Sequence, residues 1–173
     1  FSGFRLRAPL NRPDVMDEFV VFQGASYFRA VARGTLYGIS ARGLAIGTGS
    51  AEGEEFPLFR GFWIHKPNDR DRYVVIHALL DSRSVSGAFE FRITPGAETV
   101  FDTRVALFPR QDMRNIGIAP LTSMYLFGAN QPSDSLNFRP QLHDSEGLAI
   151  HAGNGEWLWR PLNNPKHLSV SNF

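Results

Sequence analysis

Alternation of apolar and polar residues over strand-length segments constrains the fold of this chain more than any other feature. Across 88–93, the side chains of Phe89, Phe91 and Ile93 fall on one face of an extended chain, and Glu90 and Arg92 fall on the other. Turn-forming residues such as Pro95 and Gly96 separate segments of this kind. No stretch keeps the apolar spacing of an amphipathic helix over three turns. The sequence therefore predicts an all-β protein.

Aromatic and turn residues favour the same fold class. Aromatic residues make up 13% of the chain, and they suit half-buried pleated surfaces. Gly34 is expected to form a hairpin turn, and Pro95-Gly96 is expected to join two long antiparallel strands. About ten strands without helices indicate a β-sandwich or a barrel. The expected strands are 19–22, 27–33, 35–40, 59–66, 72–80, 85–94 and 98–108.

Charge and composition exclude several classes of protein. Eighteen basic and seventeen acidic side chains leave a net charge of +1 without a basic stripe, so no nucleic-acid partner is expected. No apolar run approaches the roughly 20 residues of a membrane helix, so we expect no membrane insertion. The chain has no cysteine, and its five histidines have no metal-ligand spacing on one element. We expect neither a metal nor a cofactor.

The chain beyond Pro109 has a different composition, in which long structured loops are expected to carry a binding site. Residues 139–160 combine carboxylates, imidazoles, indoles and guanidinium groups. This mixture suits a sugar site, because indole faces stack on pyranose rings while polar groups bind hydroxyls and handle the glycosidic oxygen. The candidate residues are Arg139, His143, Asp144, Asn154, Glu156, Trp157, Trp159 and Arg160.

Some of these residues have a second, purely structural interpretation. Trp157 and Trp159 are two positions apart, and they could fill a core from one face of a strand. Asp144 could orient the imidazole of His143, or it could accept backbone N–H groups in an Asx turn. Both alternatives stay open at this point.

An earlier cluster has the same ambiguity. Arg42, Arg29 and Tyr27 could reach a ligand, but pairing with Glu54 and Glu55 at the base of a loop is favoured. Neighbouring carboxylates on an extended chain point apart, so residues 53–57 are expected to close one sandwich edge rather than to form a catalytic dyad.

Long composite motifs make the chain resemble the periplasmic glucan biosynthesis proteins G and D. The matching runs extend over almost the whole sequence, and both types of member share them. They are Gly24-Ala-Ser-Tyr-Phe-Arg29, Tyr37–Ala45, Gly53–Pro57, Phe62–Ile64, Ala119–Met124, Leu126–Gly128, Asn130–Pro132, Leu142-His-Asp-Ser145, His151–Trp157 and Trp159–Leu168.

The resemblance implies a fold and a location. Residues 1–173 would be part of an N-terminal β-sandwich of the galactose-mutarotase-like kind, which acts on glucan in the periplasm. The chain would be a piece of a larger two-domain protein, without that protein's C-terminal immunoglobulin-like domain. The implied partners are β-1,2-glucan and other components of the glucan synthesis machinery. A homodimer stays open.

The resemblance also implies a reaction, the inverting endo-hydrolysis of β-1,2-glucan. The general base of the family corresponds to Asp144 in the His-Asp-Ser motif, and the general acid would lie outside this segment. We therefore expect residues 1–173 alone to be inactive. The alternative is a non-catalytic glucan-binding or assembly factor for osmoregulated periplasmic glucan synthesis.

Overall fold

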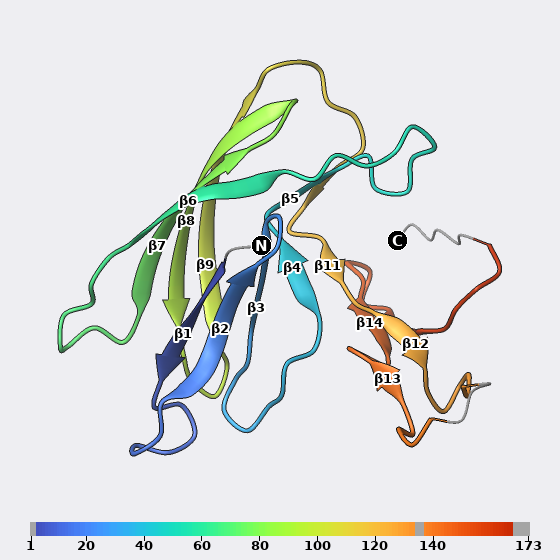
Figure 1. Cartoon of the computed structure of the whole chain (residues 1–173), viewed down its shortest axis with the longest axis horizontal. Helices are drawn as coiled ribbons and strands as arrows, with labels where there is room; N and C mark the ends of the chain where they lie inside the picture. Colours follow the sequence, from blue (N-terminus) through green and yellow to red (C-terminus); the bar gives the residue numbers. More distant parts are fainter. Residues whose placement is uncertain (1–2, 134–136, 168–173) are drawn as a thin grey trace. The chain divides into compact units, whose positions relative to one another are not determined.

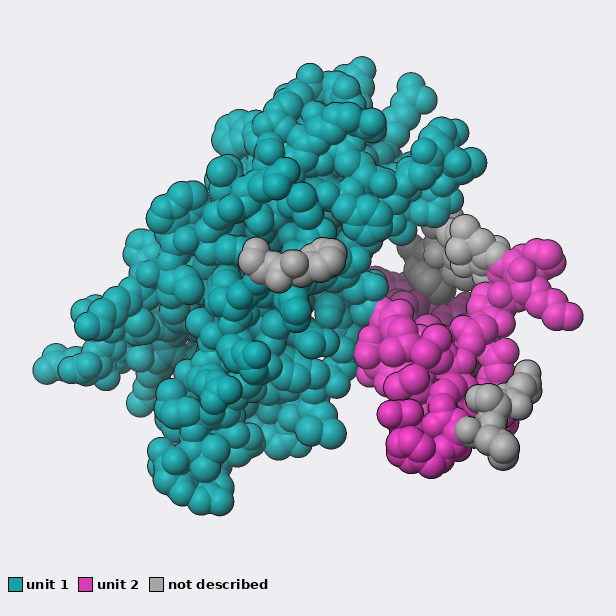
Figure 2. Space-filling model, viewed as in Figure 1, with its two compact units in different colours: residues 1–122 teal, residues 123–173 magenta. Residues whose placement is uncertain are grey.

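The structure, a computed structural model, describes residues 3–133 and 137–167. Every regular element in these two ranges is a β-strand, which confirms the predicted all-β class. The described residues contain no helix that is long and apolar enough to cross a membrane. The chain divides into two compact units, Phe1–Thr122 and Ser123–Phe173, which Figure 2 colours separately.

A four-stranded antiparallel sheet forms one layer of unit 1 (Figure 1). Its longest pair is joined through Pro95-Gly96, as the sequence predicted, and the register of this pair runs from Val85↔Pro109 to Thr94↔Val100. Along the first strand of this pair, residues 85–94, the side chains alternate regularly between buried and less buried positions. In order across the sheet, the strands are β6 (Leu58–Ile64), β7 (Val74–Asp81), β8 (Val85–Thr94) and β9 (Val100–Pro109).

A five-stranded antiparallel sheet forms the other layer, and a short two-stranded sheet accompanies it. The two-stranded sheet pairs β5 (Leu44–Ile46) with β10 (Ile116–Ile118). The five strands, in order across the sheet, are β1 (Gly3–Ala8), β2 (Asp17–Gln23), β3 (Tyr27–Ala30), β4 (Ser40–Arg42) and β11 (Leu121–Thr122).

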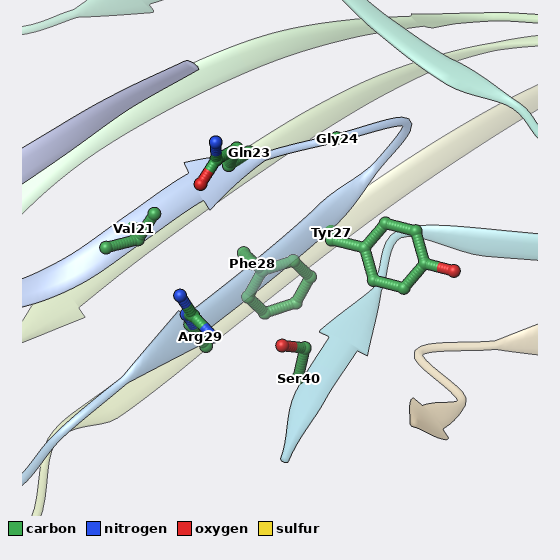
Figure 3. Close-up of a pocket in the computed structure, with 7 residues that line it drawn as sticks. All are labelled: Val21, Gln23, Gly24, Tyr27, Phe28, Arg29 and Ser40. Carbon is green, nitrogen blue, oxygen red and sulfur yellow. The ribbon is translucent and has the colours of Figure 1, made fainter. Parts of the chain in front are cut away.

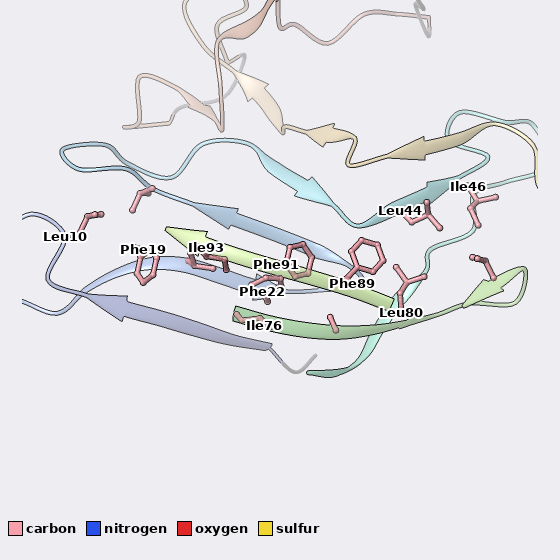
Figure 4. Close-up of a cluster of buried hydrophobic side chains, with 14 residues drawn as sticks. Leu10, Phe19, Phe22, Leu44, Ile46, Ile76, Leu80, Phe89, Phe91 and Ile93 are labelled. Atoms are coloured by element: carbon pink, nitrogen blue, oxygen red, sulfur yellow. The ribbon is translucent and has the colours of Figure 1, made fainter. Parts of the chain in front are cut away.

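Aliphatic side chains and phenylalanine rings fill the space between the two layers, which makes unit 1 a β-sandwich (Figure 4). Phe91 of β8 is fully buried, and its ring centroid lies 5.3 Å from that of Phe22 on β2, in the opposite sheet. Rings that also lie close to Phe91 belong to Phe28, Phe59, Phe89 and Phe101. The predicted sandwich is thus confirmed, and many of the phenylalanines serve its core.

The strand predicted at 35–40 is wrong except for its last residue, which begins β4. A turn replaces it, because Gly34 has a φ of 72° and the Thr35 hydroxyl accepts a hydrogen bond from the Ala32 amide at 2.9 Å. Leu36, within this stretch, is 92% exposed. The connection between β3 and β4 is therefore a loop and not a hairpin strand.

Unit 2 contains short strands where the sequence predicted mainly loops. They form two antiparallel pairs, and the pairing of β14 with β15 extends from Gly147↔Pro161 to His151↔Trp157. The strands are β12 (Tyr125–Phe127), β13 (Leu142–His143), β14 (Gly147–His151) and β15 (Trp157–Pro161), with β12 pairing β13. All eight predicted site residues belong to this unit.

Candidate functional site

The hairpin of β14 and β15 is closed by a turn that the local sequence specifies. The Asn154 side-chain oxygen accepts a hydrogen bond from the Glu156 amide at 2.9 Å, and Gly155 has a φ of 89°. The Gly155 amide also donates to the Ala152 carbonyl at 2.9 Å. Asn154 therefore sets the hairpin register through one amide oxygen, and its side-chain NH₂ group supplies two further donors.

Trp157 and Trp159 lie on one face of β15 and project into solvent. Their residues are 71% and 54% exposed, so the alternative that they fill a core is wrong. His151, the cross-strand partner of Trp157, stacks on its indole with ring centroids 4.4 Å apart and planes inclined by 4°. We call His151, Trp157 and Trp159 the aromatic face. It provides an exposed aromatic surface with polar edges, as recognition of a sugar ring requires.

Gly147 allows Trp159 to lie across the start of β14. A Cβ atom at position 147 would lie 2.6 Å from Trp159 Cζ2 and 2.5 Å from the Arg160 carbonyl oxygen. Neither distance is compatible with a carbon atom there, so the close approach of the two strands requires glycine.

We expect Gly147→Ala to displace Trp159 and to destabilise the protein by about 1–3 kcal/mol, the usual cost of overpacking. Thermal unfolding followed by tryptophan fluorescence measures both effects. Gly153→Ala is the matched control, because nothing lies within 4 Å of a Cβ atom at position 153. Equal melting temperatures and spectra for the two variants would contradict this packing.

Asp144 follows β13 and is held by two hydrogen bonds with the backbone of Met124. Its amide donates to the Met124 carbonyl at 2.8 Å, and the Met124 amide donates to Asp144 Oδ2 at 3.0 Å. The hydroxyls of Ser123 and Ser145 lie 2.6 Å apart beside this pair. The carboxylate thus accepts a backbone N–H from a distant segment, which differs from the local Asx turn considered above. Asp144 is exposed, so solvent reaches it.

His143 packs inward against Tyr125. Their ring centroids lie 5.4 Å apart at an interplanar angle of 20°. Within the described ranges, neither His143 Nδ1 nor the Tyr125 hydroxyl has a hydrogen-bond partner, although both atoms are buried. In the described part of the chain, Asp144 therefore does not orient the His143 imidazole by a hydrogen bond to Nδ1.

The remaining candidates occupy the periphery of unit 2. Arg139 stacks on its neighbour Phe138, with the guanidinium carbon 4.5 Å from the ring centroid. Glu156 and Arg160 are both exposed on or beside β15, and Arg160 alternates with Trp159 and so lies on the opposite face of the strand. The sequence analysis assigned no role to His151. The available signal was the tight turn at 152–156, which sets His151 opposite Trp157.

A shallow groove opens on unit 1, beside β2, β3 and β4 (Figure 3). Its cavity has a volume of about 260 Å³. Figure 3 shows the polar groups of Gln23, Tyr27, Arg29 and Ser40 around it. The Arg29 guanidinium carbon lies 5.0 Å from the centroid of the Tyr37 ring, which orients that side chain.

Glu54 and Glu55, beyond β5, have structural partners, and of the favoured pairings the described residues show that of Arg42 with Glu54. Arg42 is buried and forms an ion pair with Glu54. The carboxylate of Glu55 accepts hydrogen bonds from the Ser82 and Ser84 hydroxyls and, at 2.8 Å, from the Ser84 amide. Burial raises the pKa of Glu55, but these hydrogen bonds outweigh burial, and the net pKa is lowered.

The lowered pKa of Glu55 predicts a loss of stability in acid. A depressed folded-state pKa stabilises the protein above the ordinary carboxyl pKa, and this contribution disappears as the pH falls through the folded-state value. We expect Glu55→Gln to cost about 1–3 kcal/mol at pH 7 and progressively less below about pH 4.5. Glu98→Gln, at an exposed position, is the control. A Glu55→Gln deficit that is independent of pH in thermal unfolding would contradict this account.

Comparison with known proteins gives a match over the whole chain. The sequence model of the family described as "Periplasmic glucan biosynthesis protein, MdoG" matches residues 1–173. The chain is 60% identical over 173 residues to "Glucans biosynthesis protein G" of Pseudomonas paraeruginosa, 58% to that of Rhodopseudomonas palustris and 58% to that of Pectobacterium carotovorum. All 173 residues align in each case, and they span 33%, 34% and 33% of these relatives. The chain thus spans about a third of their length.

Proposed function

The chain belongs to the periplasmic glucan biosynthesis protein family, and from this premise we propose that it contributes to the inverting endo-hydrolysis of β-1,2-glucan in the periplasm. Asp144 is the general base, and the general acid comes from outside residues 1–173. The observation that carries this proposal is an exposed carboxylate, fixed by the Met124 backbone, in the same compact unit as an exposed aromatic face.

Inverting hydrolysis requires a base that removes a proton from water on the face of the sugar opposite the leaving oxygen. In such enzymes the two carboxyl groups are about 6.5–9.5 Å apart, which leaves room for that water. The backbone bond to Oδ2 fixes the Asp144 carboxylate, so its orientation does not depend on substrate. Asp144 takes the proton directly or through a hydroxyl relay, and the carboxylic acid elsewhere protonates the leaving oxygen.

The aromatic face and the peripheral polar groups bind the substrate in this proposal. Trp157 and Trp159 stack on glucose rings, because the indole surfaces are exposed and on one strand face. Hydrogen bonds to hydroxyls of the same glucan chain come from Arg139, His143, Asn154 and Glu156, whereas Arg160, on the opposite face of β15, contacts glucose units beyond the stacked rings. Residues 1–173 are then part of a larger N-terminal β-sandwich domain that acts on glucan.

A second candidate function is a non-catalytic glucan-binding or assembly factor. The name of the relatives, "Glucans biosynthesis protein G", describes synthesis rather than cleavage, and this favours the second candidate. Such a factor would use the aromatic face to hold nascent glucan together with other components of the synthesis machinery.

Incubating the full-length protein with linear β-1,2-glucan separates the two candidates. The proposal predicts new reducing ends that increase with time, together with saturable binding of glucan. Binding without new reducing ends would reject hydrolysis for this protein and favour the assembly factor.

A further inference from the structure

Four side chains form a row across the outer face of the sheet β6–β9. In the strand register, Trp63 lies opposite His77, His77 opposite Glu90, and Glu90 opposite Arg104. Directly opposed residues share a sheet face, and the core residue Phe91 has the other parity, so these four point away from the core. We call Trp63, His77, Glu90 and Arg104 the cross-strand row. Three strand spacings give it a length of about 14 Å.

Hydrogen bonds fix the middle of the cross-strand row before any ligand arrives. His77 Nδ1 lies 3.0 Å from His65 Nε2, and His77 Nε2 lies 3.1 Å from Glu90 Oε2. The Arg104 guanidinium lies 3.9 Å from the other Glu90 oxygen. Because both ring nitrogens of His77 are engaged, its orientation is set by its neighbours. Preorganised polar groups lower the entropy cost of binding.

Trp63 provides an exposed aromatic surface at one end of the row. It is 58% exposed, and its six-membered ring lies beside Gly61 of the same strand. A Cβ atom at position 61 would lie 3.3 Å from Trp63 Cη2, so a larger residue there would push the indole outward by a few tenths of an ångström. The indole therefore contacts the sheet while much of its surface remains open to solvent.

The charges around the row alternate in sign. In the neighbouring row, Arg92 lies opposite Asp102, so acidic and basic groups are interspersed over this face. A surface without one dominant sign does not favour a polyanion such as nucleic acid. His77 is hydrogen-bonded to His65 on one side and to Glu90 on the other. The described residues contain no group of three His, Cys, Asp or Glu side chains arranged to hold a metal ion.

We propose that the cross-strand row is a second glucan-binding surface, which stacks one glucose ring on Trp63 and binds the hydroxyls of the adjoining chain through Glu90 and Arg104, while His77 holds the Glu90 carboxylate in place. A neutral, polyhydroxylated ligand is what an exposed indole beside alternating donors and acceptors fits best. The choice of glucan as ligand rests on the proposed function. The row belongs to unit 1, whereas Asp144 and the aromatic face belong to unit 2.

Calorimetric titration of the full-length protein with linear β-1,2-glucan tests this surface, in an Asp144→Asn background that prevents cleavage during the titration. Trp63→Ala is expected to raise the Kd about five- to tenfold, the loss of one aromatic stacking contact. Trp63→Phe is expected to recover part of this loss. Arg104→Ala is a second variant that the fold should tolerate, since Arg104 is exposed. Phe108→Ala, an exposed aromatic residue of β9 outside the row, is the control.

An increased Kd for Trp63→Ala or Arg104→Ala, with Phe108→Ala within twofold of the parent, supports the row. A Kd within twofold of the parent for both row variants overturns the proposal that the row binds glucan. The same result is expected if another protein covers this face instead. Trp157→Ala, titrated in parallel, reports on the aromatic face independently. Because the readout is binding, hydrolysis by Asp144→Asn at the wild-type rate would reject the catalytic proposal without deciding the fate of the row.

Discussion

Asp144→Asn is expected to lower the rate of β-1,2-glucan cleavage by the full-length protein by about a hundred- to ten-thousandfold, the usual contribution of a general base. An amide cannot take the proton of the attacking water. Its oxygen can still accept the Met124 amide bond that now goes to Oδ2, so the fold around position 144 should persist. Reducing ends counted under saturating glucan give the rate.

The control for this experiment is Asp69→Asn, which makes the same chemical change at an exposed loop position. Its rate should stay within twofold of the wild type. Equal melting temperatures for the two variants would show that any loss of rate at position 144 is chemical and not a loss of folded protein. A folded Asp144→Asn variant with a wild-type rate would contradict the assignment of the base.

Phe91→Ala is expected to destabilise the protein by about 3–5 kcal/mol, because a large buried ring would leave a cavity between the two sheets. Phe91 is fully buried, and its ring centroid lies 5.1 Å from that of Phe28 and 5.3 Å from that of Phe22. Neighbouring rings on two packed sheets cannot easily move to fill the space. Chemical denaturation measures the free energy of unfolding.

Phe108→Ala is the matched control for the core, since Phe108 is an exposed phenylalanine on the adjacent strand β9. It should change the free energy of unfolding by less than about 0.5 kcal/mol. A similar, small effect of both substitutions would contradict the packing of the two sheets around Phe91.

The strands that could be predicted from sequence are those whose alternation continues over many residues. β8 was predicted with its observed ends, because its alternate apolar side chains are the ones that enter the core. Strands of two or three residues, such as β11 and β13, are too short to show a period and were missed. At 35–40 the local turn outweighed the apparent alternation, since the Thr35 hydroxyl bonds to the Ala32 amide.

Site features depended on contacts that no local pattern reveals. The sequence indicated Trp157 and Trp159 as sugar-stacking candidates, but their exposure and the stacking of His151 follow from the hairpin register. The bond from the Met124 amide to Asp144 joins segments twenty positions apart in the chain, so the sequence alone left two roles open. The cross-strand row likewise depends on the register of four strands joined by loops of different lengths.

Proton NMR of the first product released from linear β-1,2-glucan by the wild-type full-length protein tests the central claim most directly. If Asp144 activates a water molecule on the face opposite the leaving group, the new reducing end appears first as the α-anomer and then equilibrates. Initial release of the β-anomer would show retention of configuration and contradict the role of Asp144 as the general base of an inverting hydrolase.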